Sequence, residues 1–207
     1  GFSVRKLRLR ASEAADVFYL ASLMLLYAFW LKNPEVMFFI TCIYAVCFLK
    51  FVLKHHVARP LLIGLAIAFA YLTVFKGFYH YQAFTLHIFG YPLFPLLAWP
   101  LALTLMSYYA RMLACVLKLE RLWPKVFVAY GVYAIMLIVL EYTAYHYLNI
   151  RLASSYSSLP LIDCLHTPAS LKVVYFINGF FFFTVYFYLN DLYSTRSVSG
   201  RHRSLRT

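Results

Sequence analysis

The chain has 207 residues, of which 64% are hydrophobic, 20% aromatic and only 13% charged. Soluble domains carry about 25% charged residues, so a mean hydropathy of +0.73 excludes an ordinary soluble protein. The net charge of +12 would suggest nucleic acid in a soluble protein. Basic residues at the ends of apolar helices are instead expected to meet anionic lipid headgroups, so membrane lipids are the expected partners and nucleic acid is not.

Apolar stretches of span length follow one another along the chain. Polar segments separate them, and Asn33-Pro34 ends the first stretch. The sequence predicts an all-α transmembrane bundle of six spans in a single domain, residues 1–195, followed by a basic flexible tail, residues 196–207. The predicted spans are residues 15–31, 36–53, 60–75, 92–117, 124–147 and 171–189.

Basic residues alternate between the polar segments. Fifteen of the nineteen fall in the first, third, fifth and seventh segments. Because basic loops resist translocation, this asymmetry predicts that both termini are cytoplasmic, in an integral protein of the plasma membrane. The fifteen residues are Arg5, Lys6, Arg8, Arg10, Lys50, Lys54, Arg59, Arg111, Lys118, Arg121, Lys125, Arg196, Arg201, Arg203 and Arg206.

Acidic residues are scarce, so their positions are informative. Glu141 follows the apolar run GVYAIMLIVL in the outer half of the fifth span. A carboxylate at that depth is costly and usually faces the bundle interior for a function, so Glu141 is a candidate proton donor. The alternative is a structural carboxylate paired with an Arg, His or Tyr. Five other acids lie at span ends, where solvation accounts for them: Glu13, Asp16, Glu35, Glu120 and Asp191.

Histidines gather on the outer side, where they and Glu141 are expected to line one polar cavity. Three interpretations remain: a general acid/base site, a metal or haem site, or scattered interfacial histidines. Metal ligation favours tight motifs such as histidines at i and i+4, whereas Glu141 and His146 are about 140° apart around a helix. We therefore expect no metal and no cofactor. The outer histidines are His80, His87, His146 and His166, and the candidate catalytic residues are Glu141, His146, Asp163 and His166.

The remaining histidines and the cysteines are expected to have solvated or structural roles. His55, His56 and His202 fall in cytoplasmic segments, where water solvates them. The cysteines have no metal-ligand spacing and behave as small apolar residues, and no disulfide is expected. They are Cys42, Cys47, Cys115 and Cys164.

Other outer residues are candidates for substrate binding. Arg151 either binds a phosphate or carboxylate group or forms an ion pair with Glu141 or Asp163. The many tyrosines and phenylalanines are mostly belt and packing residues, while a smaller share lines a groove for a lipid or isoprenoid chain. The candidate binding residues are His80, Tyr81, His87, Trp99, Tyr142, Arg151 and Asn178.

Residues 87–109, HIFGYPLFPLLAWPLALTLMSYY, contain GYPLFPLLAW, which approximates the motif G-x-P-L-x-x-P-L-A-W with its second proline one residue nearer. The segment resembles a family of polytopic carotenoid-biosynthesis proteins that contains carotenoid hydratases acting on bacterioruberin precursors and monocyclic carotenes. The resemblance covers residues 80–185, with Glu141 in place of an intramembrane Asp and no match to the final Trp of the family. The matching residues are Gly90, Pro92, Leu93, Pro95, Leu96, Ala98 and Trp99, then His166, Pro168, Asn178 and Gly179.

This resemblance implies acid-catalysed hydration or cyclisation at a terminal isoprenoid double bond. Glu141 would protonate the alkene, and His146 or His166 would deprotonate the attacking water. The aromatic faces of Tyr81, Trp99 and Tyr142 would stabilise the carbocation. The resemblance implies no redox cofactor.

Two other functions fit the sequence. Small size, short spans and many aromatic residues are also typical of a non-catalytic subunit of a larger membrane complex, of respiratory or oxygenase type. A transporter or channel is the third hypothesis, although no inverted repeat is evident.

Overall fold

The computed structural model describes the backbone of residues 24, 27–152, 154–159 and 162–204, and side chains as far as Leu192. Helices dominate the described chain. Residues 27–32 end a first helical segment, but most of the predicted first span, with Ser12, Glu13 and Asp16, lies outside the described residues. The helices are α2 (Pro34–Cys47), with the π-helical turn η1 (Phe48–Val52), α3 (Ala58–Phe75), with the 3-10 turn η2 (Lys76–Phe78), α4 (Leu93–Val116), α5 (Leu122–His146) and α6 (Ala169–Ser204).

Five helical segments of the described chain are long and apolar enough to cross a membrane. Large apolar side chains such as Ile43, Ile135 and Ile177 lie on their outer faces, each more than half exposed. Water would penalise such surfaces, whereas acyl chains match them, so the chain is an integral membrane protein. The candidate spans are Pro34–Val52, Ala58–Phe78, Leu93–Val116, Leu122–His146 and Ala169–Leu192.

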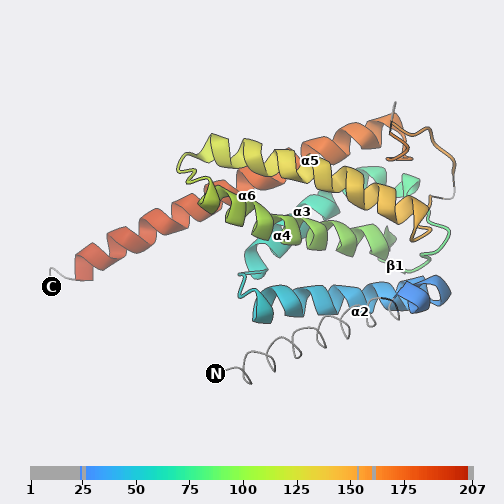
Figure 1. Ribbon diagram of the computed structural model, residues 1–207, viewed down its shortest axis with the longest axis horizontal. Coiled ribbons are helices and arrows are strands. Elements are labelled where there is room, and N and C mark those ends of the chain that lie inside the picture. The colour runs from blue at the N-terminus through green and yellow to red at the C-terminus, as the bar shows by residue number, and fades with distance from the viewer. Residues whose placement is uncertain (1–23, 25–26, 153, 160–161, 205–207) are drawn as a thin grey trace, which may run out of the picture.

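The bundle has two chemically different ends (Figure 1). The α2–α3 and α4–α5 connections and the C-terminal part of α6 lie at one end, at the left of the view. We call this the basic end, because Lys54, Arg59, Arg111, Lys118 and Lys125 belong to it. The opposite end carries a two-stranded hairpin, β1 (His87–Ile88) and β2 (Tyr91–Pro92), and the connection of residues 148–168. We call it the loop end.

Small residues allow close helix contacts in the core. A Cβ atom on Gly64 of α3 would lie 2.9 Å from the Cα of Pro100 in α4. A Cβ atom on Gly179 of α6 would lie 2.1 Å from the Tyr133 ring of α5. Both glycines therefore make room for a neighbouring helix, as small residues do in membrane bundles.

Helix α6 enters the segment predicted as a basic tail, residues 196–207. The structure continues α6 as a helix to Ser204, well beyond the span. Extending a helix that packing has already nucleated costs far less than starting a new one. The polar composition therefore marks the end of the span rather than the end of the helix.

Glu35 also differs from its prediction as a solvated residue at a span end. Its carboxylate accepts hydrogen bonds from the backbone amides of Thr85 and Leu86 and from the Thr85 hydroxyl. The Leu86 carbonyl in turn accepts from the amide of Leu93, at the start of α4. These contacts tie Glu35 and α2 to the segment that leads into the hairpin.

His55 is buried, contrary to the prediction that water solvates it. Only 7% of its surface is exposed, and its Nε2 lies 3.2 Å from the Ser107 hydroxyl of α4. Its ring packs edge-on against Tyr108. The backbone amide of His55 bonds to the carbonyl of Leu49 across the turn after η1, which folds the chain back against the bundle. Burial lowers the pKa of His55, and the charges of Arg111 and His56 lower it further.

This burial predicts a loss of stability in mild acid. The unfolded chain gains the His55 proton near the ordinary pKa of 6.5, whereas the folded chain gains it only at lower pH. Stability is therefore lost as the pH falls from about 6.5 toward the folded pKa. We expect the melting temperature in detergent to fall less in His55→Gln than in the wild type between about pH 7.5 and about pH 5.5. His80→Gln, at an exposed position of the loop end, should behave like the wild type, and an equal pH dependence in all three proteins would contradict this account.

Candidate functional site

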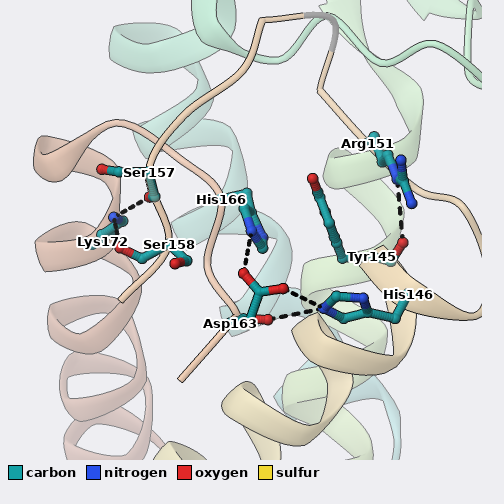
Figure 2. A network of polar contacts seen from close by, with 8 residues as sticks. All are labelled: Tyr145, His146, Arg151, Ser157, Ser158, Asp163, His166 and Lys172. Carbon is teal, nitrogen blue, oxygen red and sulfur yellow. Dashed lines mark hydrogen bonds and ion pairs between the residues drawn. The ribbon is translucent and has the colours of Figure 1, made fainter. Parts of the chain in front are cut away.

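Asp163 joins two histidines at the loop end (Figure 2). His146 is the last residue of α5, and its Nε2 lies 3.0 Å from the Asp163 carbonyl and 3.2 Å from carboxylate Oδ2. The Nε2 of His166 lies 2.9 Å from Oδ1 of the same carboxylate. One acid therefore holds two imidazoles, and the three residues form what we call the His–Asp–His network.

The contacts with Asp163 determine which ring nitrogen of each histidine is left to accept a proton. When Nε2–H donates to a carboxylate, a neutral imidazole presents Nδ1 as its proton acceptor. The Nδ1 of His166 is buried and has no hydrogen-bond partner among the described residues. An orienting carboxylate that leaves the opposite nitrogen free is the arrangement by which acids position a histidine base. His166 is therefore suited to accept a proton.

Tyr145 fixes the orientation of His166 from its other side. The two rings stack with centroids 3.7 Å apart and an angle of 11° between their planes. Arg151 lies 4.6 Å from the Tyr145 centroid, so Tyr145 lies between a cation and an imidazole (Figure 2). Within the described chain Arg151 forms no ion pair with Glu141 or Asp163, and its Nε donates to the Tyr145 carbonyl at 3.4 Å. The ion pair considered for Arg151 is thus replaced by a cation–π contact.

Glu141 lies in a different environment on the same helix. Its charge acts on the hydroxyls of four tyrosines that come from α3, the segment after it, α5 and α6. Burial raises the pKa of Tyr81, and the Glu141 carboxylate raises it further. Glu141 itself is half-buried, and its carboxylate lies within electrostatic range of these four hydroxyls. We call these residues the tyrosine cluster: Tyr71, Tyr81, Tyr133 and Tyr175, with Tyr79 bonded to Tyr175.

Hydrogen bonds connect most of this cluster. The Tyr79 hydroxyl donates to the Tyr175 hydroxyl at 2.9 Å, and the Tyr133 hydroxyl donates to the Tyr175 carbonyl at 2.5 Å. The buried Tyr71 hydroxyl has no partner among the described residues. No hydrogen bond or ion pair of the described chain joins Glu141 to a histidine. The structure thus assembles three of the four candidate catalytic residues and leaves Glu141 in a neighbouring cluster.

The candidate binding residues divide between these two groups. Tyr142 lies beside the network, with its ring 4.4 Å from that of His146. Trp99 packs on Tyr175 at 4.7 Å. The Nδ2 atom of Asn178 is buried without a partner in the described part of the chain. The backbone of Tyr81 pairs with Leu152 and so joins the two outer segments.

His80 and His87 lie apart from the network. Both are exposed, and the Nδ1 of His87 lies 2.7 Å from the Thr85 carbonyl. The hairpin pairs His87 with Pro92, which fixes it at the rim of the loop end. They fit the interpretation of scattered interfacial histidines better than that of a shared site.

Sequence reasoning missed Tyr71, Tyr79, Tyr133 and Tyr175 because it assigned tyrosines to belt and packing roles. Their hydroxyls meet only after the helices and the segment that follows α3 pack together. The pattern of nineteen tyrosines in an apolar chain contains no signal that separates these four from the others.

Two hollows lie away from both groups. One, of about 540 Å³, lies at the basic end, and its wall includes Arg111, Lys118 and Lys125. A second, very small one lies between α2 and the segment before α4, beside Glu35 and Phe84. Neither is lined by Glu141 or by the His–Asp–His network. Among the described residues, no group of three or more His, Cys, Asp or Glu side chains has the geometry of a metal site.

No family model, curated protein or solved structure matches the chain. The geometry of its own residues therefore carries the functional argument.

The bridging role of Asp163 predicts that its carboxylate orders residues 148–168. Asp163→Asn removes the charge that binds two histidines, and because Asp163 is 60% exposed, we expect a loss of about 1 kcal/mol. Hydrogen exchange of the loop amides should then be about fivefold faster, as followed by mass spectrometry. Ser154→Ala, at an exposed position of the same loop, should leave exchange unchanged. Wild-type exchange in Asp163→Asn would contradict the bridging role.

Proposed function

We propose that this chain is an integral membrane enzyme that carries out acid–base chemistry on a lipid-soluble, isoprenoid-type substrate. In this proposal it has six spans and cytoplasmic termini in the plasma membrane. One observation carries it: α5 places Glu141 within electrostatic range of tyrosines from three helices and ends, five residues later, at a histidine held by Asp163. An acid and oriented bases at one end of a bundle are the groups that proton-transfer chemistry needs.

The orientation is supported by where the polar segments lie. The α2–α3 and α4–α5 connections share the basic end with the C-terminal part of α6 (Figure 1). Their Lys and Arg residues favour the cytoplasmic side of a membrane. A first span before residue 32 would place the amino terminus on that side as well.

Cysteine labelling tests this orientation. In a chain whose four cysteines are replaced by alanine, Ser154→Cys should react in intact cells with a membrane-impermeant maleimide. His56→Cys, at an exposed position of the α2–α3 connection, should react only after the cells are permeabilised. The reverse pattern would require the opposite orientation.

The proposed reaction begins with protonation of a terminal carbon–carbon double bond. The Glu141 carboxyl gives its proton to the less substituted carbon, and the alkene electron pair forms the new C–H bond. The adjacent carbon becomes a tertiary carbocation. Tyr81 and Tyr175 lie within electrostatic range of this acid, and Trp99 packs on Tyr175 at 4.7 Å. In this proposal their rings stabilise the cation through their quadrupoles.

Water completes the addition. Its oxygen forms the C–O bond, and the Nδ1 of His166 accepts the released proton. Transfer of that proton back to the Glu141 carboxylate restores the starting state, so the net change is addition of one water. If a second double bond of the substrate attacks the cation instead, loss of a proton to the same base gives a cyclised isomer. Neither route changes the oxidation state of a cofactor.

A second candidate is a non-catalytic subunit of a larger membrane complex. The observation that favours it is the filled interior beside Glu141. Trp99 and Tyr175 pack at 4.7 Å, and neither hollow described above reaches the carboxylate. A structural carboxylate among tyrosines would satisfy this arrangement without a substrate.

Expression in a host that makes acyclic carotenes distinguishes the two candidates. We expect products heavier by one water, or cyclised isomers, in pigment extracts analysed by mass spectrometry. Glu141→Gln keeps the size of the side chain and removes the acid, so product should fall at least about 100-fold. His166→Gln should also reduce product, whereas His56→Gln should not.

Equal elution of each variant on size-exclusion chromatography is the folding control. Full product in Glu141→Gln would remove this residue from the mechanism. No product from the wild type, together with stoichiometric polypeptides that co-purify in mild detergent, would support the second candidate.

A further inference from the structure

The largest hollow described above lies at the basic end, between α4, the α4–α5 connection, α5 and α6. It has a volume of about 540 Å³, and its wall is both charged and apolar. Phe187 and Ala114 supply buried apolar surface, and Arg111 and Lys118 supply exposed cations. We call it the basic pocket. The proposed chemistry of Glu141, at the other end of the bundle, makes no use of it.

An ion pair supports one side of the basic pocket. The Nζ of Lys125 lies 2.9 Å and 3.2 Å from the two carboxylate oxygens of Asp191, which joins α5 to α6. Beside Asp191, the Asn190 amide oxygen accepts a hydrogen bond from Arg59 of α3 at 2.6 Å. These contacts fix the position of this wall, and the Asp191 carboxylate is already in an ion pair with Lys125.

The α4 side of the basic pocket carries two cations, Arg111 and Lys118. No hydrogen bond or ion pair joins the Arg111 or Lys118 side chain to another residue in the part of the chain that the structure describes. Glu120 is the only other acid of the lining, and it is exposed. The lining thus has three cations and two acids, and one acid is already paired. An anion that enters would meet unpaired positive charge.

The backbone conformation of Lys118 also supports a role for its charge. Lys118 has φ of +51°, in the left-handed region where helices usually end with glycine. The amide of Leu119 bonds to the Ala114 carbonyl at 2.9 Å and closes the end of α4 around it. A lysine at such a position costs about 1 kcal/mol relative to glycine. A cation kept at a position that favours glycine, on the wall of a hollow, suggests that its charge is used there.

We propose that the basic pocket binds the phosphate group of an anionic lipid. Arg111 and Lys118 are the phosphate ligands, because guanidinium and ammonium groups are the usual partners of phosphate oxygens. The apolar part of the lining suits the start of an acyl chain, and Met112 and Val116 continue an exposed apolar surface along α4. Basic pockets between spans on the cytoplasmic side are typical sites of lipid headgroups. A soluble phosphate is the other source of the same group.

Lys118→Gly provides a test that does not depend on loss of fold. Glycine suits the backbone of this position, so the variant should be as stable as the wild type without ligand, or more stable. The probes are short-chain phosphatidic acid, short-chain phosphatidylcholine and inorganic phosphate, each titrated into purified protein in uncharged detergent. The measurement is the rise in melting temperature with probe concentration.

We expect phosphatidic acid to stabilise the wild type saturably, with half-saturation shifted about fivefold higher in Lys118→Gly and about 25-fold higher in Arg111→Gln/Lys118→Gly. Lys50→Gln, which removes an exposed cation outside the pocket, should match the wild type. Phosphatidylcholine should have a much smaller effect. Equal stabilisation by inorganic phosphate, lost in the same variants, would support the phosphate site and identify a soluble ligand as its source.

Two results would overturn the proposal. One is a response to phosphatidic acid that Lys118→Gly and the double variant leave unchanged. The other is an equal loss of response in Lys50→Gln and Lys118→Gly, which would show attraction to the whole basic surface rather than binding in the pocket. Either result leaves the Glu141 proposal untouched, because product formation is measured separately.

Discussion

A bilayer offers no hydrogen bonds to the groups within it, and this constraint governs where the polar side chains of the bundle lie. An unpaired polar group in hydrocarbon costs several kcal/mol, and several polar side chains near the span ends have partners on other elements. Lys125 pairs with Asp191, Arg59 with Asn190, and His55 with Ser107. At the basic end, these contacts join α5 to α6, α3 to α6, and the α2–α3 connection to α4. The groups that hold the bundle together at this end are therefore polar, while apolar side chains cover the faces toward lipid.

At the loop end, polar groups find their partners in the longer connections between the helices. Glu35 binds the amides of residues 85 and 86, Tyr81 pairs with Leu152, and Asp163 binds the last residue of α5. These contacts tie the two outer segments to α2, to α5 and to each other. A site built there is positioned by contacts from several elements, which is how loops hold functional side chains in place.

Hydropathy was enough to predict the described spans, because the length of an apolar stretch decides whether a helix can cross a bilayer. It also separated Glu141 from the acids at span ends, and it placed His146, Asp163 and His166 on one side.

Hydropathy did not predict the burial of His55 or the amide contacts of Glu35, because both depend on how the connections fold back onto the helices. The tyrosine cluster was missed for the same reason. Its hydroxyls come from positions far apart in the chain, and single-residue composition does not distinguish them from lipid-facing tyrosines.

Helix geometry limits how Glu141 and the imidazoles can act together. Five residues advance a helix by about 7.5 Å and turn it by about 140°, so one small group does not bridge the carboxyl and the His146 ring directly. His166, the proposed base, is held by the same Asp163, and no hydrogen bond or ion pair among the described residues joins it to Glu141. Keeping the two groups apart is useful in the proposed reaction. The acid must reach the double bond first, and the base must reach water only after the cation has formed. In this proposal, a donor beside the tyrosine cluster and an acceptor in the His–Asp–His network keep the two proton transfers apart. A direct contact between them would neutralise the acid and the base before either met a substrate.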